Sequence, residues 1–126
     1  MRKQQKGFSL IELLIVVAII LIIAAIAIPN LMRARMAAND SSAAASERTT
    51  VTGEIGYFAA YPTVGYTQLS ALGGVSPCTP APATGCLIDN NLATNGAGGG
   101  KSGYNFTAVA VTGAGSPIPN EFYTTC

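Results

Sequence analysis

A glutamate lies inside an otherwise apolar stretch near the start of this 126-residue chain: within residues 8–28 the only polar side chains are Ser9 and Glu12. A carboxylate in the centre of a membrane helix costs on the order of 3 kcal/mol on insertion scales, so Glu12 needs a partner. If the chain is cut after Gly7, the new α-amino group of Phe8 stands one helical turn from Glu12. That cation can pair with the Glu12 of a neighbouring copy, which neutralises two costly groups inside a bundle of helices.

The cysteines define a second candidate site. Cys78 and Cys86 bracket a loop that contains Pro and Gly, and in a chain exported to an oxidising compartment this spacing predicts a disulfide. Cys126 is then left over. Together with the strand-like residues 122–125, it predicts either that the natural chain continues with another strand and a fourth cysteine, or that a neighbouring chain supplies them. The alternative is a small head with a free thiol at a frayed end.

Other chemistry finds little support. The chain has no His, the commonest metal ligand and general base at neutral pH. It shows no Ser/His/Asp set, paired carboxylates or metal cluster, so we expect no enzyme, no metal and no cofactor. Residues 95–102, NGAGGGKS, approach a phosphate-binding pattern but carry Asn95 where it requires Gly, so we assign no nucleotide. The formal charge of +1 and the lack of a basic run beyond the N-terminus argue against nucleic acid.

Residues 8–28 must position Glu12, and their 21 residues suffice to cross a bilayer as a helix. Residues 1–7 form a short leader that carries three cations, and positive charge before an apolar helix keeps that end in the cytoplasm. We predict one helix over residues 8–58, with a membrane-spanning half at 8–28 and an amphipathic half at 29–58. Pro29 is expected to bend the helix or open it locally.

The amphipathic half is rich in Ala, which favours helix. Val51, Ile55 and Phe58 fall at i, i+4 and i+7, and we predict that this apolar stripe faces the core. The helix should end at residue 61, because a residue before proline resists helical geometry.

Residues 59–126 are predicted to form a loop-rich β head. Gly, Pro, Ser and Asn dominate residues 62–103, where we expect loop with a short strand at 85–89. Alternating residues at 104–112 predict a second strand, and residues 122–125 a third. The fold class is therefore α+β, a ladle-shaped subunit in which a long N-terminal helix packs against a small antiparallel sheet.

The segment GFSLIELLIVVAIILIIAAIAIP, residues 7–29, closely resembles the class III signal of type IV prepilins. In that family a prepilin peptidase cuts after the Gly and methylates the new N-terminal Phe, the Glu governs assembly, and the Pro marks where the helix loosens. The resemblance assigns these roles to Gly7, Phe8, Glu12 and Pro29. It is strong over residues 7–33, weaker over 34–74, and departs from many pilins in having no Gly in the middle of the apolar helix.

The resemblance implies a structural subunit of a type IV pilus. Its partners would be the peptidase, the inner membrane before assembly, and further copies of itself in an extracellular filament. The rivals are a pseudopilin of a type II secretion system, a minor pilin acting as an adhesin, an ordinary signal peptide cleaved before Ile28, and an uncleaved membrane anchor. Residues 104–126 contain one acidic residue, Glu121, which is too few for the calcium loop of major pseudopilins.

Overall fold

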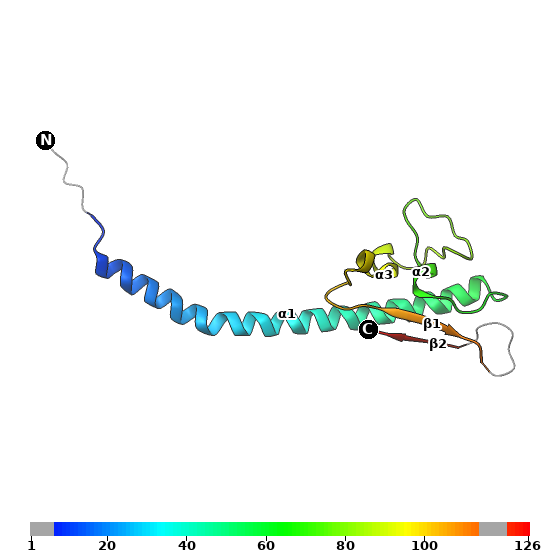
Figure 1. The fold of residues 1–126 in the computed structure, drawn as a ribbon, viewed down its shortest axis with the longest axis horizontal. Coiled ribbons are helices and arrows are strands. Elements are labelled where there is room, and N and C mark those ends of the chain that lie inside the picture. The colour runs from blue at the N-terminus through cyan, green and yellow to red at the C-terminus, as the bar shows by residue number, and fades with distance from the viewer. Residues whose placement is uncertain (1–6, 114–120) are drawn as a thin grey trace. The chain divides into compact units, whose positions relative to one another are not determined.

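The computed structural model describes residues 7–113 and 121–126 (Figure 1). Its elements, in chain order, are α1 (Leu10–Ala60), α2 (Leu69–Leu72), α3 (Asn90–Ala93), α4 (Asn95–Gly98), β1 (Thr107–Val111) and β2 (Glu121–Thr125). The chain divides into two compact units, Met1–Ala37 and Ala38–Cys126, which are considered separately. A long apolar helix followed by a small antiparallel sheet confirms the predicted α+β class. Residues 1–6, which hold the leader cations, lie outside the described residues.

The helix α1 begins and ends two residues later than the predicted range of 8–58, a difference within the usual fraying of helix ends. Its last turn closes through the hydrogen bond from the Tyr61 N–H to the carbonyl oxygen of Tyr57, at 2.8 Å. Pro62 follows directly, so the predicted stop signal acts where expected.

The face of α1 that the second unit covers is not the predicted apolar stripe. Val51 and Phe58 are half-buried and Ile55 is 57% exposed. The buried residues of α1 are smaller or more polar: Ala43, Ser46, Thr50, Gly53, Glu54 and Tyr57. Space decides this orientation, because a Cβ atom on Gly53 would lie 2.8 Å from Cγ2 of Ile88. The chain crosses α1 where its side chains are small, and the larger apolar residues are left at the edge of the contact.

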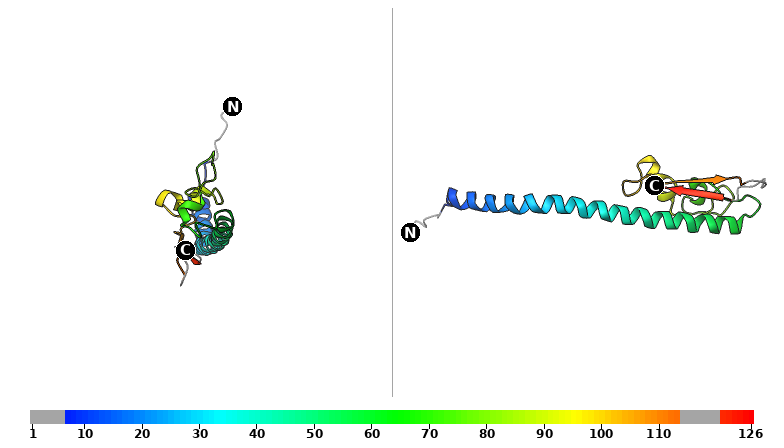
Figure 2. Two further views of the ribbon diagram at one scale, coloured as in Figure 1. Left: turned by 90° about the vertical axis from the view of Figure 1, so that its right-hand side faces the viewer. Right: turned by 90° about the horizontal axis from the view of Figure 1, so that it is seen from below.

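The core of the second unit gathers along the C-terminal part of α1 (Figure 2). Tyr57 of α1 belongs to one buried cluster with side chains from the short helices, the stretch before α3 and the start of the hairpin, namely Leu69, Leu72, Ile88, Leu92, Ala93, Phe106 and Ala108. The segment predicted as loop therefore contains three short helices, α2, α3 and α4. Each is one turn long, too short for a periodic pattern in the sequence to reveal it.

The predicted strand at residues 85–89 does not form. Its backbone is interrupted at Cys86, whose φ of +57° lies in the left-handed region, and the stretch runs beside the end of α2 instead of another strand. The Gly85 N–H donates to the carbonyl oxygen of Ala71 at 2.6 Å, and the Leu87 N–H donates to that of Leu72 at 2.8 Å. Its backbone groups are thus satisfied by a helix terminus, which has free carbonyl groups to offer.

The other two predicted strands are present as β1 and β2. They pair antiparallel, with Thr107 opposite Thr125 and Val111 opposite Glu121. The predicted alternation holds at the start of the hairpin: Phe106 and Ala108 are buried, while Thr107 is exposed. A two-stranded sheet is marginal alone. Packing of Phe106 and Ala108 into the core therefore contributes much of its stability.

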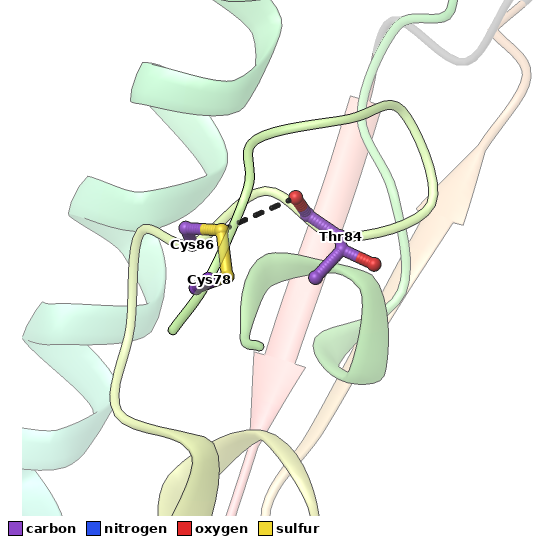
Figure 3. The surroundings of a disulfide bond; sticks show 3 residues. All are labelled: Cys78, Thr84 and Cys86. Carbon is purple, nitrogen blue, oxygen red and sulfur yellow. Dashed lines mark hydrogen bonds between the residues drawn. A yellow bond between two sulfur atoms is a disulfide. The ribbon is translucent and has the colours of Figure 1, made fainter. Parts of the chain in front are cut away.

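Cys78 and Cys86 form a disulfide with their Cα atoms 6.0 Å apart, as the sequence predicted (Figure 3). The turn between them is tightened by a bridge that pairs Ala81 with Thr84. Within this ring, Sγ of Cys86 lies 3.6 Å from the carbonyl oxygen of Thr84. A Cβ atom on Gly74 would lie 2.0 Å from Sγ of Cys78, so only glycine fits beside the crosslink.

We predict that replacing both Cys78 and Cys86 with Ser lowers the free energy of unfolding by about 2–3 kcal/mol, since a short closed loop removes a limited amount of unfolded-state entropy. Thermal unfolding in detergent under non-reducing conditions measures the loss. The control is Cys126→Ser, which removes an exposed free thiol and should leave the stability unchanged. Non-reducing peptide mapping that finds Cys78 and Cys86 as free thiols in exported protein would contradict the crosslink.

Candidate functional site

The predicted cleavage position lies ahead of the first helical turn. Gly7, Phe8 and Ser9 have no regular secondary structure, and α1 begins at Leu10. The Phe8 side chain is 83% exposed, and a Cβ atom on Gly7 would meet nothing within 4 Å. The Gly7–Phe8 peptide bond is therefore accessible, and the chain itself places no steric limit on the side chain at position 7.

Glu12 sits in the first turn of α1, where its carboxylate turns back along the chain. Its Oε2 accepts a hydrogen bond from the backbone N–H of Ser9 at 2.9 Å. The Leu13 N–H donates to the Ser9 carbonyl oxygen at 3.3 Å, which closes the first turn. Ser9 is thus the N-cap residue and Glu12 the third helical residue, which is one half of a capping box. A carboxylate here also interacts favourably with the helix dipole.

The sequence analysis missed this role of Ser9, although the spacing Ser-x-x-Glu before an apolar run is a recognised signal for it. The hydrogen bond from Ser9 also changes which interaction partner the Glu12 carboxylate still lacks. One carboxylate oxygen has a hydrogen-bond donor within its own chain, but no cation is paired with the group among the described residues. The partner that Glu12 lacks is therefore a positively charged group, because a neutral hydrogen-bond donor is already present.

The remainder of the first unit is an uninterrupted helix, apolar from Leu13 to Pro29 and carrying Arg33 and Arg35 beyond it. α1 passes through Pro29 without a break, so of the two predicted effects, a bend or a local opening, this structure does not show the opening. The proline removes one donor from the helix ladder, and the bonds on either side are sufficient to hold it. α1 is long and apolar enough to cross a membrane, and none of its most apolar window is buried within the chain. Its large side chains, such as Ile20 and Ile23, are about half or more exposed.

The remaining predicted site residues lie in the second unit. Cys78 and Cys86 are joined, and Cys126 is an exposed free thiol one residue after β2. No group of three or more metal-ligating side chains occurs among the described residues. In the glycine-rich stretch, the Asn95 side chain is committed to the backbone of Phe106, donating to its carbonyl oxygen at 2.7 Å and accepting from its N–H at 2.6 Å.

The aromatic residues at the end of α1 pack as the sequence analysis favoured. The Tyr57 ring lies 4.9 Å from that of Tyr61, and its hydroxyl donates to the carbonyl oxygen of Pro82. Phe58 stacks on Tyr66 with ring centroids also 4.9 Å apart. These ring contacts pack the chain that follows α1 against the end of the helix.

Comparisons with known proteins point to the N-terminal segment. A family model described as the prokaryotic N-terminal methylation motif matches residues 2–28. Over 39 residues the chain is 64% identical to the type IV wide pilus major component PilA4 of Thermus thermophilus. That alignment covers 31% of this chain and 30% of the relative, so the likeness spans less than a third of either protein. No solved structure matches the chain. The N-terminal segment, which holds the accessible Gly7–Phe8 bond and the capped Glu12, therefore carries the prokaryotic N-terminal methylation motif and is similar to the matching segment of a type IV pilus component.

Proposed function

We propose that this chain is a structural subunit of a type IV pilus, processed by a prepilin peptidase and polymerised through α1. The observation that carries the proposal is the combination of a fully uncovered apolar helix with a carboxylate at its N-terminus that lacks a cation. A single-span anchor could use the first feature in a bilayer. The second is best explained by a positive charge that arrives at the same depth.

Processing supplies that charge. Hydrolysis of the peptide bond between Gly7 and Phe8 releases the leader and creates an α-amino group on Phe8. Methylation of this amine leaves its positive charge in place. The leader takes three cations with it, so the formal charge falls from 7−6 = +1 to 4−6 = −2 before the new amine is counted. The mature end then presents one cation beside one carboxylate, both at the start of an apolar helix.

Assembly follows from the need to keep the apolar surface of α1 covered. Before polymerisation the first half of α1 lies in the inner membrane, with residues 38–126 outside. In the extracellular filament the same surface is covered by the α1 helices of other copies, so it stays out of water throughout. Inside such a bundle the amine of one copy pairs with the Glu12 carboxylate of another, and the two charges neutralise each other.

The processing step predicts that Gly7→Phe leaves the leader attached. The structure shows open space at position 7, so the chain tolerates the ring and only the binding pocket of the peptidase rejects it. Intact mass and N-terminal sequencing measure the outcome, with N-methylated Phe8 as the expected start of the wild-type protein. Gly7→Ala is the matched control, and its leader should still be removed. A wild-type N-terminus at Ile28 would identify an ordinary signal peptide instead.

The assembly step predicts that Glu12→Gln lowers the yield of sheared filaments on the order of a hundredfold, because a buried charge that loses its partner costs about 3–5 kcal/mol. Gln keeps an oxygen that can accept from the Ser9 N–H, so this variant removes the charge and preserves the helix cap.

The control is Glu12→Ala, which removes both the charge and the cap. If the charge is what matters, the two variants should assemble equally poorly while membrane insertion and cleavage continue in both. Normal piliation of the Gln variant alongside failure of the Ala variant would show that the cap, and not the amine pairing, is required.

A further inference from the structure

A second glutamate of α1 is completely buried in the unit formed by residues 38–126. Glu54 has no exposed surface, whereas Ile55, the next residue, is 57% exposed. Burial of an ionised carboxylate is costly unless it is paired with a cation or fully hydrogen-bonded. The contacts of Glu54 satisfy neither condition.

The carboxyl group makes one hydrogen bond. Its Oε2 accepts from the backbone N–H of Thr67 at 3.1 Å. Its Oε1 is shielded from solvent and has no hydrogen-bond partner among the described residues. Within residues 7–113 and 121–126, no ion pair reaches it either. A buried carboxyl group in this setting is cheaper to keep neutral, because an uncompensated charge costs far more than an unsatisfied hydroxyl.

Thr67 belongs to a stretch that folds back along α1, which we call the fold-back segment (residues 61–67). Its first turn is closed by hydrogen bonds from the N–H groups of Val64 and Gly65 to the carbonyl oxygen of Tyr61, at 3.0 and 3.1 Å. The Tyr66 ring then stacks on Phe58, two residues before the helix ends at Ala60. The bond between Thr67 and Glu54 is the last of these attachments, one further turn back along the helix.

Burial raises the pKa of Glu54 above its ordinary value of 4.5, and the Thr67 N–H offsets part of that rise. The titratable or charged groups on the surrounding elements are Glu47, Arg48 and Tyr57 on α1, Tyr61 and Tyr66 in the fold-back segment, and Asp89 before α3. None of them contributes to the shift. The perturbation therefore comes from the packing of the fold-back segment and its neighbours over the carboxyl group.

We propose that Glu54 is a protonation-dependent latch for the fold-back segment. In the neutral form the proton resides on Oε1, Oε2 accepts from Thr67, and the segment lies closed on α1. Ionisation places a charge on a group that has one donor and is shielded from solvent, and solvating that charge requires the segment to move off the helix. The latch lies wholly within residues 38–126, so it stands independently of the filament proposal.

The direction of the pH dependence follows from the raised pKa. Below about pH 4.5 both the folded and the unfolded chain hold the proton, and the latch contributes fully. Above that pH the unfolded chain loses its proton first, so the folded chain binds more protons and its stability falls as the pH rises. The loss is complete once the pH exceeds the raised pKa of the folded chain.

The test compares the full chain in detergent micelles with its Glu54→Gln variant, using hydrogen exchange at the Thr67 amide. Gln keeps an acceptor oxygen for Thr67 and cannot ionise. When the pH is raised from about 4.5 to about 8, the wild-type protection factor should fall about tenfold or more, and that of the variant should stay constant. The matched control is Glu121→Gln, an exposed residue on β2, which should behave as the wild type.

A wild-type protection factor that does not change over this range would overturn the latch, as would an equal fall in the Glu54→Gln variant. If that variant does not fold, the wild type decides the matter through the carbon chemical shift of the Glu54 carboxyl group. A midpoint above pH 4.5 supports the latch, and one at or below pH 4.5 refutes it. Neither measurement depends on cleavage or filament assembly, so failure here is distinguishable from failure of the proposed function.

Discussion

The apolar surface of the first half of α1 must be covered at every stage of the life of this chain. Nothing within its own unit covers it, since the most apolar window is wholly unburied. Burial of such a surface is the largest favourable term available to a small protein. A bilayer can provide it, and under the proposed function a bundle of identical helices provides it as well, so that passage from one to the other never exposes the surface to water. The other features of the N-terminus matter because they decide which of the two is preferred.

Two carboxyl groups of α1, those of Glu12 and Glu54, have the same pattern of hydrogen bonding. Glu12 and Glu54 each accept a hydrogen bond from one backbone N–H, of Ser9 and of Thr67 respectively, and neither is paired with a cation among the described residues. Their surroundings separate their roles. Glu12 is exposed, so a cation from another copy can reach it, whereas Glu54 is buried by its own chain. Under the two proposals, the Glu12 carboxylate therefore favours assembly, whereas Glu54 stays a neutral acid.

The sequence predicted well what is local and periodic. The long apolar run, the stop before Pro62, the alternation around Phe106 and the spacing of Cys78 and Cys86 each depend on neighbours in the chain, and the structure agrees with them. Predictions failed where distant segments compete for one surface. The stripe through Ile55 had the right period, but the chain returning at Ile88 needs the space above Gly53. That requirement is invisible until both segments are in place.

The same reasoning explains why residues 85–89 were misread as a strand. Their composition suits an extended backbone, but Cys86 has a φ of +57°, outside the extended region, and strand pairing also requires a second strand alongside. The partner actually present is the end of α2, whose carbonyl groups at Ala71 and Leu72 accept the N–H groups of Gly85 and Leu87. A helix of one turn leaves nearly all of its carbonyl groups without internal donors. The short helices and the segments beside them thus satisfy each other's backbone hydrogen-bonding groups. This lets a head with one small hairpin form a core around Tyr57.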